Sequence, residues 1–324
     1  MNINIKIEDK KTYEFYNPKD TVEILYREIL KKGIWKLNIK NNKEEKKDWW
    51  YESKNDFEKN INLLFSKFIP KSSLRNEEKE NKDKYLQFII SELAKLEEKL
   101  INFNFIKERN QELTKILERY GYTKLSFEAI CSWRLIIGLG GTHPQETSMT
   151  LHHVYGIPYI PGSAIKGVTR HWAILKFADH SVKEENEDFS EVLEKISKGL
   201  EKGENFDLTV DGITFIDLIQ IFGTQKEIGK VIFMDAYPIS KINLKIDIMN
   251  SHYPQYYLGK EPPADWQNPV PIKFLTIEKT KFQFYLLSHN RNLLSCAEKL
   301  LKEALREHGL GAKTSLGYGT FDMI

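Results

Sequence analysis

From residue 127 to residue 323, segments typical of strands and of helices follow one another in an order that restricts the possible folds more than any other feature. The predicted strands are 127–139, 229–238, 272–277, 281–287 and 320–323, each an apolar or alternating run beside turn residues. The predicted helices are 164–177 and 293–305, where apolar residues recur every three or four positions. In the first of them, the predicted apolar face consists of Ile165, Val168, Trp172 and Leu175. The segments 272–277 and 281–287 alternate well enough to form a hairpin with each other, so we interpret the order as strand, helix, strand, hairpin strand, helix, strand. It predicts an α+β fold with a ferredoxin-like (RRM-type) βαββαβ core.

Two insertions lengthen this core, at about 183–228 and 239–271. The first begins with an acidic stretch, 183–207, in which nine acidic residues accompany four lysines, and we predict it to be helical and solvent-facing. It ends with a short helix over 214–222. The second insertion holds five prolines and several aromatic residues, which indicate a long, non-helical excursion.

Residues 1–125 differ from the remainder in composition and carry no motif that we can match to a function. They contain only two of the 18 glycines, and their charged residues are dense. Apolar spacing over 85–100 predicts a helix, and the opening INIKI predicts a strand, whereas 41–60 and 71–84 are typical of charged connectors. We therefore divide the chain into a mainly helical N-terminal region, 1–125, and a core domain, 126–324.

Composition excludes several classes of protein. The formal net charge is only +2, so any site for a polyanion must be a local patch. The two cysteines, Cys131 and Cys296, are too few for a disulfide framework or a cysteine zinc site, and they fit a reducing cytoplasm. No apolar run approaches the roughly 20 residues of a membrane helix. The N-terminal sequence lacks the basic-then-apolar order of a signal peptide.

A glycine-rich loop near the C-terminus has the composition of a phosphate-binding loop. Its residues are Gly309, Gly311, Lys313, Thr314, Ser315, Gly317, Tyr318 and Gly319. Glycine lets backbone N–H groups approach a ligand closely, and a lysine and two hydroxyls lie among these glycines. The loop is not a Walker A motif, because Ala312 precedes the lysine and a strand follows. The alternative interpretation is a flexible connector with an exposed lysine.

A second basic element opens the first helix of the core. Ser163 is placed to cap this helix, and Lys166 and Arg170 lie one turn apart on the same face. With Gly162 at the helix N-terminus, these residues form a polar stripe that is suited to contact phosphate. The alternative is an ordinary solvated helix flank.

Arg134 is a further candidate for a basic surface. It lies on the opposite strand face from Trp133 and Leu135, so it could join a basic patch on the sheet. An arginine at a sheet edge in water is an equally good interpretation.

The sequence offers no convincing catalytic or metal site. Five of the eight histidines cluster in the middle of the chain, but the zinc motif of two histidines four residues apart is missing. We expect His152 and His153, on opposite sides of an extended segment, to hydrogen-bond, to stack on bases or to lie on the surface. General acid–base catalysis of RNA cleavage is the alternative. Among the lone acids Asp211, Asp217 and Asp235 no spacing suggests a catalytic pair, and we expect Asp235 to make a structural hydrogen bond.

Four segments together resemble the RAMP superfamily of CRISPR-associated proteins. They are 138–173, 221–238, 265–277 and 309–321, and their most specific pieces are IPGSAIKG, which opens a helix, and GLGAKTSLGYG. The resemblance covers about residues 127–323. The arrangement is most similar to the sixth-subunit family of the type III-B effector, the Cmr complex.

This resemblance implies a core that binds guide RNA in a multi-subunit ribonucleoprotein, toward the 3′ end of the guide and beside other RAMP subunits. Such a subunit helps to position target RNA for antiviral defence. By position, the helix start from Gly162 to Arg170 and the loop 309–319 contact the guide backbone, and 239–271 is the candidate for a thumb that displaces a base. The cleaving aspartate of backbone subunits has no recognisable counterpart. We therefore expect a non-catalytic subunit without a cofactor or metal.

Two other interpretations stay open. In one, the chain is a metal-independent endoribonuclease that processes precursor guide RNA, with His152 or His153 as the general base. In the other, it is a protein–protein scaffold whose basic residues are incidental, so that the complex assembles without RNA.

Overall fold

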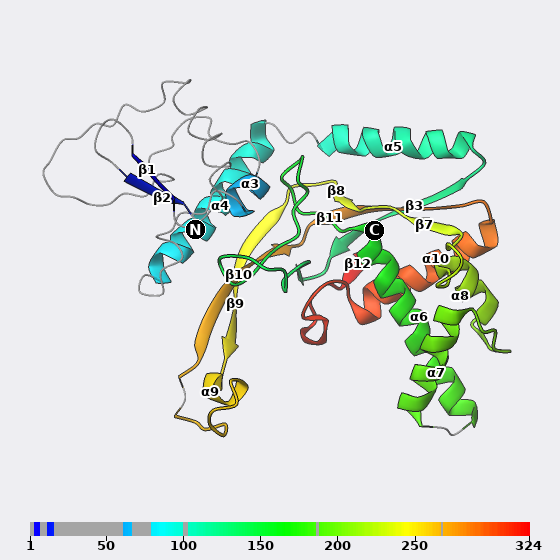
Figure 1. Ribbon diagram of the computed structural model, residues 1–324. Helices are drawn as coiled ribbons and strands as arrows, with labels where there is room; N and C mark the ends of the chain where they lie inside the picture. Colours follow the sequence, from blue (N-terminus) through cyan, green and yellow to red (C-terminus); the bar gives the residue numbers. More distant parts are fainter. Residues whose placement is uncertain are drawn as a thin grey trace, which may run out of the picture. The chain divides into compact units, whose positions relative to one another are not determined.

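The computed structural model describes residues 3–6, 12–15, 61–66, 79–99, 103–185, 188–266 and 268–324 (Figure 1). The chain forms two compact units, and each unit is built from three stretches of sequence. The first comprises Met1–Ile101, Leu139–Ile157 and Leu244–Thr276, and the second comprises Asn102–Gly138, Pro158–Asn243 and Ile277–Ile324. The division at residue 125 stays a prediction, since each unit draws on separated stretches of the chain.

A five-stranded antiparallel sheet is the centre of the second unit (Figure 1). Its strands are β3 (Thr123–Cys131), β7 (Val231–Phe233), β8 (Tyr237–Pro238), β11 (Lys281–Ser288) and β12 (Phe321–Met323). The order across the sheet is β12-β3-β11-β7, and β8 also pairs with β11. The central pair of β3 and β11 keeps one continuous register from Ile130↔Lys281 to Thr123↔Ser288. Every residue of β11 after Lys281 is buried, so other elements pack on both faces of this strand.

The helices of the second unit pack on this sheet or on one another. They are α5 (Phe103–Arg119), α6 (Gly162–Glu185), α7 (Phe189–Lys202), α8 (Phe215–Phe222) and α10 (Arg291–Glu303), with a π-helical turn, η2 (Ala304–His308), directly after α10. Figure 1 shows α6, α8 and α10 together on one side of the sheet and α5 on the other. None of the helices in the described part of the chain is long and apolar enough to cross a membrane.

Local sequence explains where several of these helices begin. Thr214 and Asp217 form a reciprocal capping box at the start of α8, and the Asn290 side chain accepts hydrogen bonds from the first turn of α10. The short strands β5 (Thr209–Val210) and β6 (Ile213–Thr214) are joined by Asp211 and Gly212, whose φ angles of 51° and 78° are those of a tight hairpin turn.

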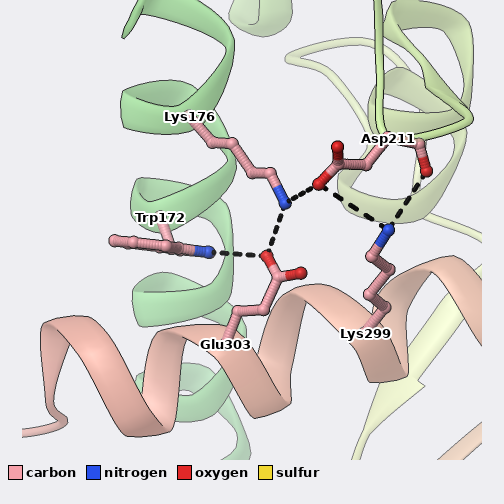
Figure 2. Close-up of polar contacts among 5 residues, drawn as sticks. All are labelled: Trp172, Lys176, Asp211, Lys299 and Glu303. Atoms are coloured by element: carbon pink, nitrogen blue, oxygen red, sulfur yellow. Dashed lines mark hydrogen bonds and ion pairs between the residues drawn. The ribbon is translucent and has the colours of Figure 1, made fainter.

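A polar cluster holds α6 against α10 (Figure 2). Glu303 Oε2 accepts hydrogen bonds from Trp172 Nε1 at 3.1 Å and from Lys176 Nζ at 2.7 Å. Lys176 Nζ also lies 2.6 Å from Asp211 Oδ2, and Lys299 Nζ lies 3.7 Å from the same oxygen. Burial alone would lower the pKa of Lys176, but its hydrogen bonds to Asp211 and Glu303 raise it above the ordinary value. Lys176 therefore stays charged and links α6, α10 and the β5–β6 turn.

The described part of the first unit contains two β-hairpins and three helices, one of which is a single turn. Its described elements are β1 (Ile3–Lys6), β2 (Thr12–Phe15), α3 (Ile61–Ser66), α4 (Lys79–Lys99), β9 (Asn243–Ser251), α9 (Pro254–Tyr257) and β10 (Val270–Glu278). β1 pairs with β2 and β9 pairs with β10, and α9 lies in the connection between β9 and β10. The last two residues of β10 belong to the second unit, where they pair with β4 (Arg134–Leu135).

The segment 139–157 packs on the helices of the first unit. The ring of His143 stacks on Phe65 with 4.4 Å between centroids, and its Nε2 lies 2.9 Å from the Phe65 carbonyl oxygen. Lys82 Nζ pairs with Glu146 at 2.9 Å. Burial lowers the pKa of His143, so the neutral imidazole is the form that this packing favours.

Several predicted elements are confirmed with shifted ends. The helix predicted over 293–305 is α10 with its π-helical turn, the helix over 214–222 is α8, and the helix over 85–100 is α4. The strands predicted at 320–323 and at the opening INIKI are β12 and β1.

Three predictions of local structure are wrong. The segments 272–277 and 281–287 do not pair with each other, because β10 pairs with β9 and β4, whereas β11 pairs with β3, β7 and β8. The segment 127–139 is not one strand, since a bend after Cys131 separates β3 from β4. The insertion 239–271 contains the strand β9 and the helical turn α9, so it is not a non-helical excursion.

The charged stretches also differ from their predictions. α7 confirms a helix within 183–207, but Val192, Ile196 and Leu200 are buried, so one face of this helix packs inward. Of the connectors, 79–84 belongs to α4, and 41–60 and 71–78 lie outside the described residues.

Candidate nucleic-acid interface

Helix α6 begins where Gly162 packs against the backbone of β7. A Cβ atom at this position would lie 2.2 Å from the carbonyl oxygen of Phe233, so a larger residue does not fit. The Gly162 N–H donates a hydrogen bond to Asp235 Oδ1 at 2.7 Å. This bond confirms the structural role predicted for Asp235, and it engages the Gly162 amide within the protein.

Ser163 lies inside the first turn of α6 rather than before it. The carbonyl oxygen of Pro161 accepts hydrogen bonds from the N–H groups of Ala164 at 2.9 Å and Ile165 at 3.1 Å, and the helix begins at Gly162. The predicted capping role of Ser163 is therefore wrong. Ser163 is exposed, and its contact with phosphate stays a prediction.

The buried face of α6 also differs from the predicted one. Its buried side chains are Ile165, Thr169, Ala173, Ile174, Phe177, Ala178 and Ser181. Val168, Trp172 and Leu175, which we assigned to the apolar face, are only partly buried. The reason is that α7, α10 and the sheet all pack on this helix, so its buried side is wider than one stripe.

The outward side of α6 carries the two predicted cations. Lys166 and Arg170 are partly exposed, and both burial and the nearby charge of Arg170 lower the pKa of Lys166. Arg170 Nη2 lies 3.6 Å from Glu201 Oε1 of α7. Because that pair is partly exposed, water screens most of its energy. The two cations repel each other, since they lie one turn apart on the same helix.

The glycine-rich loop is closed and fixed by backbone hydrogen bonds. Across its neck, the Leu310 N–H donates to the Gly319 carbonyl oxygen at 2.8 Å. The Gly319 N–H donates to the Arg134 carbonyl oxygen at 2.7 Å, and the Ala312 N–H donates to that of Ile136 at 2.9 Å. The loop is therefore anchored to β4 and to the residue after it, unlike a flexible connector.

Three of its glycines are required by close packing within the chain. Gly309, Gly311 and Gly319 have positive φ angles, and a Cβ on each would meet a carbonyl oxygen at 2.7, 2.3 and 1.9 Å, respectively. Gly317 also has a positive φ, of 86°, but nothing lies within 4 Å of its Cβ position. The glycine pattern that predicted close approach of a ligand thus has an internal explanation at three positions, and ligand contact there stays a prediction.

The outer turn of the loop carries the polar side chains. Lys313 has a φ of 63°, and the 3₁₀ turn η3 (Thr314–Leu316) follows it. Ser315 is exposed and Lys313 and Thr314 are partly exposed. Tyr318 is only 5% exposed, and its ring lies 5.9 Å from Lys313 Nζ. Tyr318 therefore supports the loop from inside.

The residue that precedes the glycine-rich loop contacts α6. His308 directly precedes Gly309, and its ring centroid lies 5.0 Å from that of His171 and 6.3 Å from that of Trp172. Burial, and then the charge of His171, lower the pKa of His308. The structure thus brings the two predicted basic elements together in one unit.

Arg134 is joined to the same loop through its carbonyl oxygen. Its guanidinium carbon lies 5.2 Å from the ring centroid of Trp133, and its Nε lies 4.0 Å from Glu278 Oε1. We did not select Trp133 from the sequence, although its indole is 43% exposed and contacts the ring of Tyr318. The available signal was a tryptophan next to an arginine at the end of a strand.

His152 and His153 belong to the first unit and are described apart from these elements. The chain turns at 153–155, and the ring of His152 stacks on those of His153 and Tyr155, so the prediction of opposite sides of an extended segment is wrong. His152 Nδ1 accepts hydrogen bonds from the Val154 and Tyr155 N–H groups at 3.2 and 3.1 Å. That lone pair is therefore occupied, which does not favour His152 as a general base.

The described part of the chain shows neither a cluster of metal ligands nor an activated thiol at Cys131. Over those residues, no group of three or more His, Cys, Asp or Glu side chains could hold a metal ion. Cys131 and Cys296 form no disulfide, and burial raises the pKa of Cys131 to about 12, so this thiol is not a ready nucleophile.

Comparison with known proteins begins with a family match that covers most of the second unit. A family model of the RAMP superfamily matches residues 127–322, which confirms the resemblance found in the sequence. The CRISPR system Cmr subunit Cmr6 of Pyrococcus furiosus is 41% identical over 219 residues, which are 57% of this chain and 64% of that protein. The match thus spans less than two thirds of that relative. The CRISPR system CMR subunit Cmr6 of Saccharolobus solfataricus is 25% identical over 267 residues, which are 81% of this chain and 79% of that protein.

A solved structure is similar in fold. It is a chain in the cryo-EM structure of the type III-B Cmr-beta complex bound to cognate target RNA, with a TM-score of 0.51 and 23% sequence identity. The similarity covers 77% of this chain and 75% of that chain, and it agrees with the predicted α+β class. The matched family region includes most of the sheet, α6 and the glycine-rich loop. The chain therefore belongs to the RAMP superfamily.

Proposed function

We propose that this chain is a non-catalytic RNA-binding subunit of a type III-B CRISPR effector ribonucleoprotein. It holds guide RNA toward the 3′ end, packs beside other RAMP subunits and helps to position target RNA. Membership of the RAMP superfamily and the similarity to two proteins named as Cmr6 subunits support this assignment.

The observation that carries the proposal is Gly167. This glycine lies inside α6 between Lys166 and Arg170, is exposed, and has nothing within 4 Å of its Cβ position. Glycine within a helix costs about 1 kcal/mol relative to alanine, and neither a positive φ nor internal packing requires it here. A smooth surface between two cations is what a ribose-phosphate backbone needs for close approach.

The chemistry of the surface suits RNA of any sequence. Guide RNA differs from one spacer to the next, so contacts must fall on phosphate, 2′-OH and base faces. Lys166, Arg170, Lys313, Thr314 and Ser315 supply charge and hydroxyl groups for such contacts. The outer turn of the loop and the outward side of α6 are both supported by rigid elements, which limits the entropy lost on binding.

The sheet of the second unit supports a ferredoxin-like core. If β3, α6, β7, β11, α10 and β12 are taken as the six core elements, their chain order is βαββαβ. In the sheet order β12-β3-β11-β7, the last core strand, β12, lies beside the first, β3. The third core strand, β11, lies between the first and the second, β7. α7, β5, β6 and α8 then form the insertion between α6 and β7.

The β9–β10 hairpin is the proposed thumb of the first unit. The connection between its strands exposes Tyr256, Tyr257, Leu258 and Trp266, at 51%, 67%, 65% and 79%. Large apolar side chains at a hairpin tip are suited to wedge against a base and displace it from a duplex.

Replacing Lys166 and Lys313 by alanine together tests the proposal. We expect the assembled complex to bind repeat-derived guide RNA at least tenfold more weakly at moderate salt. The slope of log K against log salt should fall by about 1.4, because each lost contact to single-stranded RNA removes about 0.7. A gel shift across a salt series measures both quantities.

The matched control replaces Lys198 and Lys226, two exposed lysines of the same unit that lie outside the interface. Their double alanine variant should bind like the parent chain. Unchanged binding and an unchanged salt slope in the Lys166/Lys313 variant would contradict the proposal.

A further inference from the structure

Trp133 is a partly exposed indole at the edge of the proposed interface. It lies in the bend between β3 and β4, and 43% of its surface is exposed. Tryptophan is highly buried on average in folded proteins, although it is rarely buried completely. The exposed part of this indole lies beside the proposed RNA site and is therefore accessible to a ligand.

The surrounding side chains hold this indole in place. The guanidinium carbon of Arg134 lies 5.2 Å from the Trp133 ring centroid, and the ring of Tyr318 meets it edge-on, at 4.9 Å and 63°. Tyr318 is almost fully buried, so the glycine-rich loop supports the indole from within. The Trp133 carbonyl oxygen also accepts a hydrogen bond from the Lys279 N–H at 3.3 Å. The ring is thus presented by a fixed framework.

Cations flank the same aromatic pair. Arg134 lies beside Trp133, and Lys313 Nζ lies 5.9 Å from the Tyr318 ring centroid. The Gly319 N–H binds the Arg134 carbonyl oxygen at 2.7 Å, which ties the loop that carries Lys313 to the strand that carries the indole. An exposed aromatic ring beside cations is a pattern by which proteins hold single-stranded nucleic acid without reading its sequence, and here Trp133 is the exposed ring while the buried Tyr318 supports it.

We propose that Trp133 is a stacking platform for one base of the single-stranded RNA at this interface. This inference rests on the proposed RNA-binding function and adds the nucleobase, of any identity, as the group that Trp133 takes. Phosphates on either side of that base lie toward Lys313 and Arg134. In this proposal Trp133 contributes to RNA affinity by stacking on a base face. The cations of α6 and of the loop contribute by contacting the RNA backbone.

The test compares an unstructured RNA oligonucleotide with an abasic oligonucleotide of the same length and backbone. Binding of each to the full chain is followed by fluorescence anisotropy for the parent, Trp133→Ala and Trp133→Phe. We expect Trp133→Ala to bind the base-containing RNA about tenfold more weakly or worse, because stacking is lost. Its affinity for the abasic oligonucleotide should match that of the parent. Trp133→Phe should recover most of the loss, since it keeps an aromatic face.

Leu316→Ala is the matched control, because Leu316 is an apolar residue of the same loop that is 63% exposed. It should change neither affinity. Equal effects of Trp133→Ala on both oligonucleotides, or no effect on either, overturn the stacking role while the RNA-binding function stands. A parent chain that binds neither oligonucleotide overturns this inference, whereas the guide-binding function is decided by the gel shift on the assembled complex.

Discussion

Gly319→Ala will destabilise the second unit by about 3 kcal/mol or more. The new Cβ would lie 1.9 Å from the Leu310 carbonyl oxygen, and the φ of 72° is itself unfavourable for alanine. The only relief is to open the neck of the glycine-rich loop, which breaks the 2.8 Å bond between Leu310 and Gly319. Chemical denaturation of the full chain measures the change in the free energy of unfolding.

Gly317→Ala is the control for this prediction. Gly317 has a similar φ of 86° but open space around its Cβ position, so alanine there should cost only the backbone strain of about 1–2 kcal/mol. The two variants separate steric clash from strain. Equal destabilisation by both would show that the closed neck contributes nothing to the fold.

Two glycines of α6 should respond in opposite directions to alanine. Gly162→Ala will destabilise the chain by about 2–3 kcal/mol, because its Cβ would lie 2.2 Å from the Phe233 carbonyl oxygen and would push α6 away from β7. Gly167→Ala will stabilise the chain by about 0.5–1 kcal/mol, since alanine is the better helix former and meets nothing within 4 Å.

The Gly167→Ala variant should bind RNA more weakly, although its stability increases. If the guide backbone passes over Gly167, the added methyl group lies between Lys166 and Arg170 and weakens binding of guide RNA, although the protein is more stable. Thermal unfolding and a gel shift on the same preparation measure both effects. Gain of stability with unchanged RNA affinity would contradict close approach of the backbone at this residue.

The elements that were predicted well from the sequence are those whose determining signal lies within a few residues of the element itself. α8 and α10 begin at side chains that cap their own first turn, Thr214 and Asn290, so a window of a few residues contains the signal. The pairing of β11 could not be found this way. Phe284 lies opposite Phe127, and no residue pattern within either strand identifies the other strand as its partner.

The site was predicted as two elements rather than as a surface. Lys166, Arg170 and the loop 309–319 were selected from composition and helical spacing, and the fold brings them into one unit. The sequence could not show why most of these positions require glycine. A Cβ there would clash with carbonyl oxygens of other residues, such as Ile136, which only the fold brings close. Trp133 was missed because apolar character alone predicted a buried strand, whereas the bend after Cys131 exposes the indole.

The central claim is that α6 and the C-terminal loop jointly hold one RNA strand. It is tested most directly by assembling the complex on guide RNA that carries 4-thiouridine, irradiating it, and identifying crosslinked peptides by mass spectrometry. The account predicts crosslinks within both 163–170 and 309–319 from neighbouring nucleotides near the 3′ end of the guide. Crosslinks elsewhere on the chain, with both of these peptides unmodified, would contradict it.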